Sequence, residues 1–119
     1  MATMEQWKDM AAGAAQKATA QNAAKAAKYV AFVSKKKLAI AAEQEKIRRA
    51  YTRLGKVYYK DYVTDEEPDQ AEYAPICDEI STSYRKINAL KDEIADAKAA
   101  YSGEASAEEA DQLEALAAP

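Results

Sequence analysis

One stretch of sixty residues in this chain lacks proline and almost lacks glycine. Between residues 4 and 63 there is no Pro, and the only Gly residues are Gly13 and Gly55. Proline interrupts helices, and glycine and proline supply most turns, so a stretch without them favours one long helix. With 3 Gly and 3 Pro in 119 residues, a many-stranded sheet is disfavoured.

The stretch also carries a regular seam, whose positions follow one another at steps of three or four residues. This is the 3.5-residue repeat of a coiled coil, so we expect a long helix over about residues 4–63. A bend near residues 19–22 is the alternative. So long a helix must pack against something to be stable. The seam consists of Met4, Ala11, Ala15, Ala18, Asn22, Ala26, Tyr29, Val33, Lys36, Ile40, Gln44, Ile47, Tyr51, Leu54, Tyr58 and Tyr62.

A loop and a second helix follow. The segment 64–69 is acidic and contains Pro68, and Pro75 suits the first turn of a helix. We therefore predict a loop over residues 64–74 and a second helix over about 75–101, which ends near Gly103. Two helices joined by a loop of about ten residues fold back on each other.

The predicted fold is all-α: an elongated antiparallel helical hairpin, or coiled coil, over residues 1–103. A turn centred near Pro68 places Leu54 opposite Tyr84 and Gly55 beside that ring. Gly55 then either makes room for the ring or is a tolerated surface glycine. The predicted hairpin core consists of Ile47, Tyr51, Leu54, Tyr58, Ile80, Tyr84, Ile87, Leu90 and Ile94.

Residues 104–119 form either a third, short helix or an acidic tail. Ser106 and Glu109 match a capping box, which favours the helix. Ala110, Leu113 and Leu116 are spaced to line its apolar side.

Charge divides the chain. Residues 1–50 hold ten basic and four acidic side chains, whereas residues 51–119 hold seven basic and sixteen acidic ones. At 100° per residue, many of the bases of the first helix fall opposite its seam. A solvated face is the favoured interpretation over a membrane or nucleic-acid surface, since the net charge is −3. This basic stripe includes Lys17, Lys25, Lys28, Lys35, Lys46, Arg49 and Arg53.

The second helix is too short to cover the whole first helix, and we expect it to reach back only to about Lys36. The earlier seam then needs a partner, either a second copy in a dimer, another helical protein, or a membrane surface contacted by Trp7 and Met10. This predicted partner or membrane face consists of Met4, Trp7, Met10, Ala11, Ala15, Ala18, Tyr29 and Val33.

Residues that carry chemistry are few. The chain has no His and a single Cys, Cys77, so it lacks the commonest general base and metal ligand and any internal disulfide. The acidic loop lacks the glycine and the spacing of a calcium loop. We therefore expect no enzyme, no cofactor and no metal. The N-terminal segment lacks the features of a secretory signal, which predicts a cytoplasmic protein.

Two segments resemble a known group. Residues 46–59 contain Leu54-Gly55-Lys56-Val57-Tyr58-Tyr59, and residues 73–80 contain Tyr73-Ala74-Pro75-Ile76-Cys77. Over residues 38–100 the chain resembles small uncharacterised bacterial helical-hairpin proteins, which often carry a C-terminal zinc ribbon. Residues 101–119 contain no Cys, so the ribbon is absent here. The resemblance implies a hairpin and no particular activity.

The predicted function is that of a non-catalytic helical interaction or scaffolding module, which self-associates through its N-terminal helix. The alternative is a peripheral membrane-surface protein that uses a Lys-rich amphipathic helix.

Overall fold

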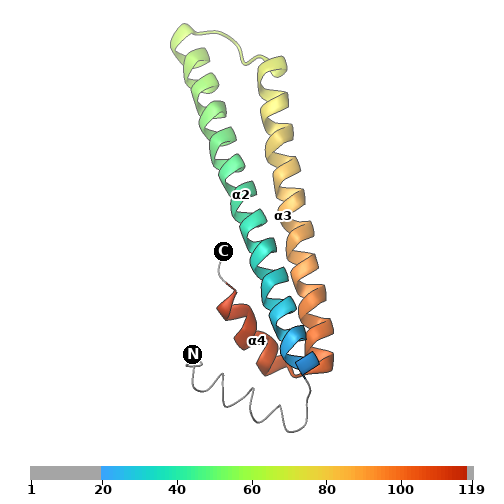
Figure 1. Cartoon of the computed structure of the whole chain (residues 1–119). Coiled ribbons are helices and arrows are strands. Elements are labelled where there is room, and N and C mark those ends of the chain that lie inside the picture. The colour runs from blue at the N-terminus through green and yellow to red at the C-terminus, as the bar shows by residue number, and fades with distance from the viewer. Residues whose placement is uncertain (1–19, 118–119) are drawn as a thin grey trace. The chain divides into compact units, whose positions relative to one another are not determined.

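A computed structural model describes residues 20–117 of the chain, which form three helices (Figure 1). They are α2 (Ala20–Thr64), α3 (Gln70–Glu104) and α4 (Ala107–Leu116). Every described residue outside 65–69, 105–106 and 117 is helical, and this part of the chain contains no strand. The prediction of an all-α helical hairpin is confirmed. The part of the predicted first helix before residue 20 lies outside the described residues.

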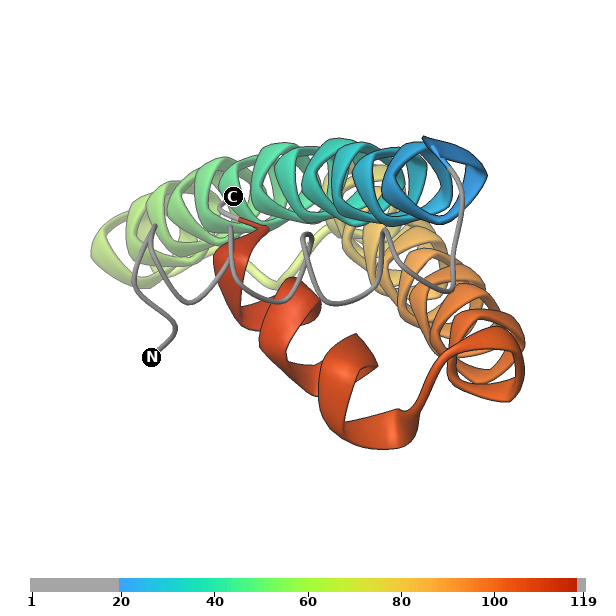
Figure 2. The same ribbon diagram turned by 60° about the horizontal axis from the view of Figure 1, so that its bottom comes forward.

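The chain divides into two compact units, and α2 and α3 each contribute to both. The hairpin unit is Leu38–Lys91, and it contains the end of α2, the connecting loop and the start of α3. The described residues of the terminal unit are 20–37 and 92–117. It therefore contains the start of α2, the end of α3 and all of α4, which Figure 2 shows from below.

The connection between α2 and α3 is shorter than predicted. Asp65 adopts the left-handed conformation with φ 54°, and the Glu66 amide donates to the Asp61 carbonyl at 3.0 Å, which closes α2 in a Schellman motif. The side-chain Oδ1 of Asp69 then accepts a hydrogen bond from the Ala71 amide at 2.9 Å. This N-cap starts α3 at Gln70. The predicted start at Pro75 is wrong, because the Asp69 cap nucleates the helix one turn and a half earlier.

The predicted end of α3 also needs correction. α3 continues to Glu104, and Gly103 is still helical, with no positive φ at any described glycine. Gly103 is therefore not the residue that ends this helix.

Isoleucine side chains form the centre of the hairpin unit. The buried cluster consists of Ile47, Ala50, Ile76, Ile80 and Ile87, with Ile40, Leu54 and Val57 packed against it. Of the other predicted core residues, Leu90 is half-buried, and Ile94 is buried but belongs to the terminal unit.

Three predicted core tyrosines are not in the core. Tyr51, Tyr58 and Tyr84 are 50%, 63% and 47% exposed, so their assignment to the core was wrong. The hydroxyl oxygens of Tyr51 and Tyr84 lie 3.5 Å apart, which places Tyr84 beside Tyr51 and not beside Leu54 as predicted. The shorter loop causes this shift, because α3 begins earlier and every α3 residue meets an earlier turn of α2.

The terminal unit covers the described part of the seam that was expected to face a partner. The rings of Tyr29 and Tyr101 stack with their centroids 4.7 Å apart, and Val33 is fully buried. Tyr29 and Val33 are therefore not part of an exposed partner face, because α3 reaches about three turns further back than predicted, to Lys25 beside Glu104. The rest of that predicted face, Met4, Trp7, Met10, Ala11, Ala15 and Ala18, lies outside the described residues.

Residues 107–116 form a helix and not a tail. The Ser106 side chain caps α4 by accepting the Glu109 amide at 3.0 Å, as the capping box predicts. Ala110, Leu113 and Ala117 are buried, whereas Leu116 is 44% exposed, so the predicted stripe was wrong at its last position.

A lysine of α2 holds the end of α4. Lys37 donates from Nζ to the carbonyl oxygens of Glu114 and Ala117, both at 3.0 Å. A cation at this place also interacts favourably with the negative, C-terminal end of the α4 dipole.

Gly55 offers a direct test of the described helix surface. A Cβ added at Gly55 has nothing within 4 Å, so the interpretation as a tolerated surface glycine holds within the described chain. Gly55→Ala is expected to raise the free energy of unfolding by about 1 kcal/mol, because alanine has the higher helix propensity. Urea unfolding followed by circular dichroism at low protein concentration measures the change.

The matched control for Gly55 is Gly103→Ala. Gly103 is also helical, and an added Cβ there has nothing within 4 Å. Because Gly103 lies in the last turn of α3, Gly103→Ala should raise the free energy of unfolding by less. A loss of stability for Gly55→Ala would show that this helix surface is not open.

Ile87 tests the isoleucine cluster. Ile87 is 5% exposed, so Ile87→Asp buries a carboxylate with no partner and should lower the free energy of unfolding by about 3 kcal/mol or more. Asn88→Asp is the matched control, because Asn88 is exposed and should change stability by less than about 0.5 kcal/mol. Equal melting temperatures for the two variants would contradict the placement of Ile87.

Candidate functional site

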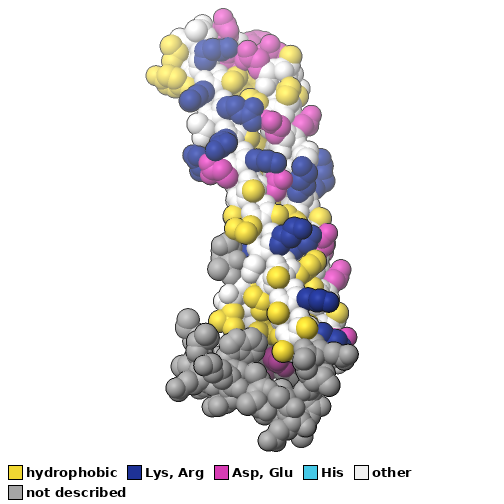
Figure 3. Space-filling model, viewed as in Figure 1, with side chains coloured by type: hydrophobic (Ala, Val, Ile, Leu, Met, Phe, Trp, Pro, Cys, Tyr) yellow, Lys and Arg dark blue, Asp and Glu magenta, His cyan; other side chains and the backbone are white. Residues whose placement is uncertain are grey.

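The hairpin unit exposes a group of large side chains that we call the tyrosine face. On α2 they follow the spacing of one side of a helix, at positions 51, 58 and 62 and at positions 59 and 63 beside them. Figure 3 shows hydrophobic side chains gathered at the end of α2 next to the loop. The tyrosine face consists of Tyr51 (50% exposed), Tyr58 (63%), Tyr59 (67%), Tyr62 (73%), Val63 (60%) and Tyr84 (47%).

Tyr51 and Tyr84 connect the two helices on this face. Their hydroxyl groups share a hydrogen bond of 3.5 Å, which raises the pKa of Tyr51 above its usual value of 10.0. The Cys77 thiol contributes in smaller measure to this rise in the Tyr51 pKa, and Cys77 is exposed. Tyr51 is therefore uncharged at neutral pH, so this part of the face presents an aromatic ring with a polar edge.

Two acidic residues occupy the inside of the hairpin unit where the predicted seam had other residues. The Ser83 hydroxyl donates to Glu43 Oε2 at 2.9 Å, and the Tyr73 hydroxyl donates to Asp61 Oδ2 at 2.8 Å. Glu43 is 8% and Asp61 5% exposed. Both buried carboxylates thus have hydrogen-bond donors, which offsets the cost of their removal from water.

These contacts change the pKa values of the groups. The hydrogen bond from Ser83 lowers the pKa of Glu43, and the nearby Lys46 and Lys86 add to that effect. Burial raises the pKa of Tyr73 to about 12, with a further contribution from the hydrogen bond to Asp61.

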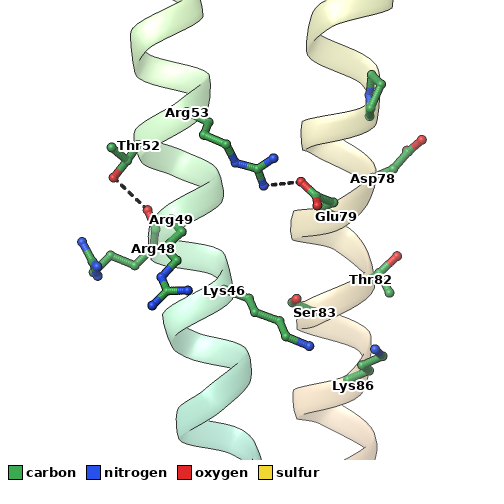
Figure 4. Close-up of a pocket in the computed structure, with 11 residues that line it drawn as sticks. Lys46, Arg48, Arg49, Thr52, Arg53, Asp78, Glu79, Thr82, Ser83 and Lys86 are labelled. Atoms are coloured by element: carbon green, nitrogen blue, oxygen red, sulfur yellow. Dashed lines mark hydrogen bonds and ion pairs between the residues drawn. The ribbon is translucent and has the colours of Figure 1, made fainter.

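The opposite edge of the hairpin unit contains a groove of about 840 Å³ between α2 and α3 (Figure 4). We call it the basic groove. It is lined by Lys46, Arg48, Arg49, Thr52, Arg53, Pro75, Asp78, Glu79, Thr82, Ser83 and Lys86.

The cations of the basic groove are engaged with carboxylates of the chain itself. Arg53 pairs with Glu79 across the groove, and Lys86 lies 3.8 Å from Glu43. The Glu45 carboxylate forms ion pairs with the guanidinium groups of Arg48 at 2.6 Å and Arg49 at 3.2 Å. The hydrogen bond from Arg48 lowers the pKa of Glu45 to about 2. The groove therefore attracts anions less strongly than its number of bases suggests.

The predicted basic stripe is exposed but largely paired. Lys17 lies outside the described residues, and Lys28 and Lys35 are exposed. In the terminal unit Lys25 lies 3.4 Å from Glu104, and in the hairpin unit Lys46, Arg49 and Arg53 pair with Glu43, Glu45 and Glu79.

Sequence reasoning missed Tyr59 and Val63 as surface residues, and it missed Glu43 and Asp61 as interior ones. One signal was present: Glu43, Ala50, Val57 and Asp61 also follow three- and four-residue steps through Ile47 and Leu54. That alternative seam was hidden because it has Ala50, Val57 and Asp61 in place of three tyrosines and a second acid, Glu43, in place of Gln44.

None of the helices described within residues 20–117 contains an uncharged, strongly hydrophobic stretch of the length that a bilayer crossing requires. The same described part of the chain contains no group of three or more His, Cys, Asp or Glu residues placed to hold a metal ion.

Comparison of the chain with protein-family models, with curated proteins and with solved structures gives no match. The resemblance to the small bacterial hairpin proteins therefore stays a prediction.

Glu43 makes the stability of the hairpin unit depend on pH. Its pKa is lower in the folded chain than the usual 4.5, so the folded state binds fewer protons than the unfolded state. Its contribution is therefore complete above about pH 4.5 and is lost as the pH falls through the folded pKa. We expect Glu43→Gln to cost about 1 kcal/mol at pH 7 and less at acid pH, measured by urea unfolding.

Glu45→Gln is the control for this prediction, because Glu45 also pairs with cations but is far more exposed. Salt at about 0.5 M should remove most of the effect of Glu45→Gln and little of that of Glu43→Gln. A pH-independent difference between Glu43→Gln and the unsubstituted chain would contradict the charged hydrogen bond to Ser83.

Proposed function

We propose that this protein is a non-catalytic helical interaction module that binds other proteins through the tyrosine face. The observation that carries the proposal is the group of six large side chains, each 47–73% exposed, on the outer surface of a two-helix unit. Tyrosine is enriched where proteins bind each other, since its ring buries a large area and its hydroxyl tolerates water.

The proposal moves the interaction surface from the place that the sequence predicted. Tyr29 and Val33 are buried within the terminal unit, so they are not available to a partner. The tyrosine face lies on the second half of α2, in the hairpin unit. A contact through Met4, Trp7 and Met10 lies outside the described residues and adds no support.

The described side chains support a role without catalysis. The chain has no His, and the Ser83 hydroxyl is used to hold Glu43 in the interior. Cys77 is exposed and has no imidazole in the chain to activate it.

The membrane-surface alternative gains no support from the described residues. Its basic stripe is largely paired with the chain's own carboxylates, and the acidic loop at Asp65, Glu66 and Glu67 lies directly after the tyrosine face. Acidic side chains beside the aromatic rings disfavour contact with anionic lipid. We expect the protein to stay in the supernatant when it is centrifuged with anionic liposomes, and sedimentation with them would favour this alternative.

Site-specific photo-cross-linking tests the proposed function. A benzophenone amino acid replaces Tyr62 in one variant and Thr82, which lines the basic groove, in the control, and both are irradiated in the native cells. The proposal predicts a cross-linked protein adduct at position 62 and much less at position 82. The absence of any protein adduct at position 62 would overturn it.

A further inference from the structure

We propose that the tyrosine face binds a second copy of this chain, with the two α2 helices antiparallel. This inference rests on the proposed function and names its partner.

The pattern of α2 is suited to a two-fold contact. Tyr51, Gly55, Tyr58 and Tyr62 follow one another at steps of four, three and four residues, so they form one row along the helix. Gly55 lies within this row and is exposed, with nothing within 4 Å of an added Cβ. The row thus contains three large rings, with a gap at Gly55 between the first ring and the second.

An antiparallel second copy brings each ring to a complementary place. With the two-fold axis between the levels of residues 56 and 57, Tyr58 of each copy lies over Gly55 of the other. Tyr51 of each copy then lies beside Tyr62 of the other. The same residues serve both copies, as a closed two-fold interface requires.

The charges along the chain favour the same antiparallel arrangement. Residues 46–60 contain six bases and no acid, and residues 61–72 contain six acids and no base. The stated axis brings Arg48 of each copy, which pairs with Glu45 within its own chain, to the level of Asp65 and Glu66 of the other copy. A parallel copy would set all six bases at the level of the same bases, whereas the stated axis does so only for Arg53, Lys56 and Lys60.

The area of the face fits a reversible dimer. The exposed fractions of its five tyrosines sum to three whole residues, which at about 200 Å² each sets an upper limit of about 600 Å² buried per copy. Stable interfaces bury about 800 Å² per partner, so we expect a weak dimer with a Kd in the micromolar range.

Analytical ultracentrifugation of the full chain over roughly 1–500 µM tests the dimer, a range chosen for an interface of this size. We expect reversible monomer–dimer behaviour that weakens as NaCl rises from about 0.05 to 0.5 M. Tyr58→Ser should weaken the dimer by about tenfold or more, because Tyr58 is central. Tyr62→Ser is the second variant, and circular dichroism checks that both remain helical.

Leu116→Ser is the control, since it removes an exposed apolar side chain from α4 and should leave the Kd unchanged. A chain that stays monomeric at the highest concentration overturns the proposal. A dimer that is unaffected by Tyr58→Ser and Tyr62→Ser overturns it as well.

Charge exchange tests the antiparallel direction. Arg48→Glu and Glu66→Arg should each weaken the dimer about fivefold or more, and the double variant should recover most of the affinity, because it restores opposite charges across the axis. A double variant that is weaker than either single variant overturns the antiparallel arrangement.

The two proposals fail in different ways. A monomeric chain whose position 62 still cross-links to a different protein overturns the second copy and leaves the interaction module standing. A chain with no adduct at position 62 and no dimer overturns both.

Discussion

The end of α2 sets the register of the hairpin unit, and the other features of that unit follow from the register. Asp65 turns the chain in the left-handed conformation, and Asp69 caps α3 only four residues later. Since the connection is this short, α3 begins at Gln70. The Ser83 hydroxyl oxygen then lies 2.9 Å from Oε2 of Glu43. A later start at Pro75 would bring Ser83 to a different turn of α2.

The sequence was sufficient to predict the helices but not the side of α2 that is buried. Isoleucines at 47, 80 and 87 and the Ser106 cap are strong local signals, and the structure has them as expected. The sequence did not decide between the neighbours Ala50 and Tyr51, because the larger apolar area of a tyrosine ring favours Tyr51 although two helices approach most closely at a small residue. Ala50 is 1% exposed, so close helix packing outweighed ring size at this position.

The buried acids explain why the register is not easily exchanged for another. Glu43 and Asp61 each accept a hydrogen bond from α3, from Ser83 and Tyr73 respectively. A slip of α3 by one turn would separate both pairs and leave two carboxylates buried without donors, which costs several kcal/mol for each. The same acids hid the seam from a reading based on apolar spacing, so the feature that makes the register specific is the one that made it hard to predict.

The two units deal differently with large aromatic side chains. In the terminal unit α4 adds a third helix, and Tyr29 and Tyr101 are buried there, with Leu113 of α4 also inside. In the hairpin unit the described chain supplies only α2 and α3, and a single interface between two helices has room for isoleucine and alanine but not for five more rings. The rings of the tyrosine face therefore stay exposed in the described chain. An antiparallel second copy would provide two further helices and make the hairpin unit one half of a four-helix arrangement.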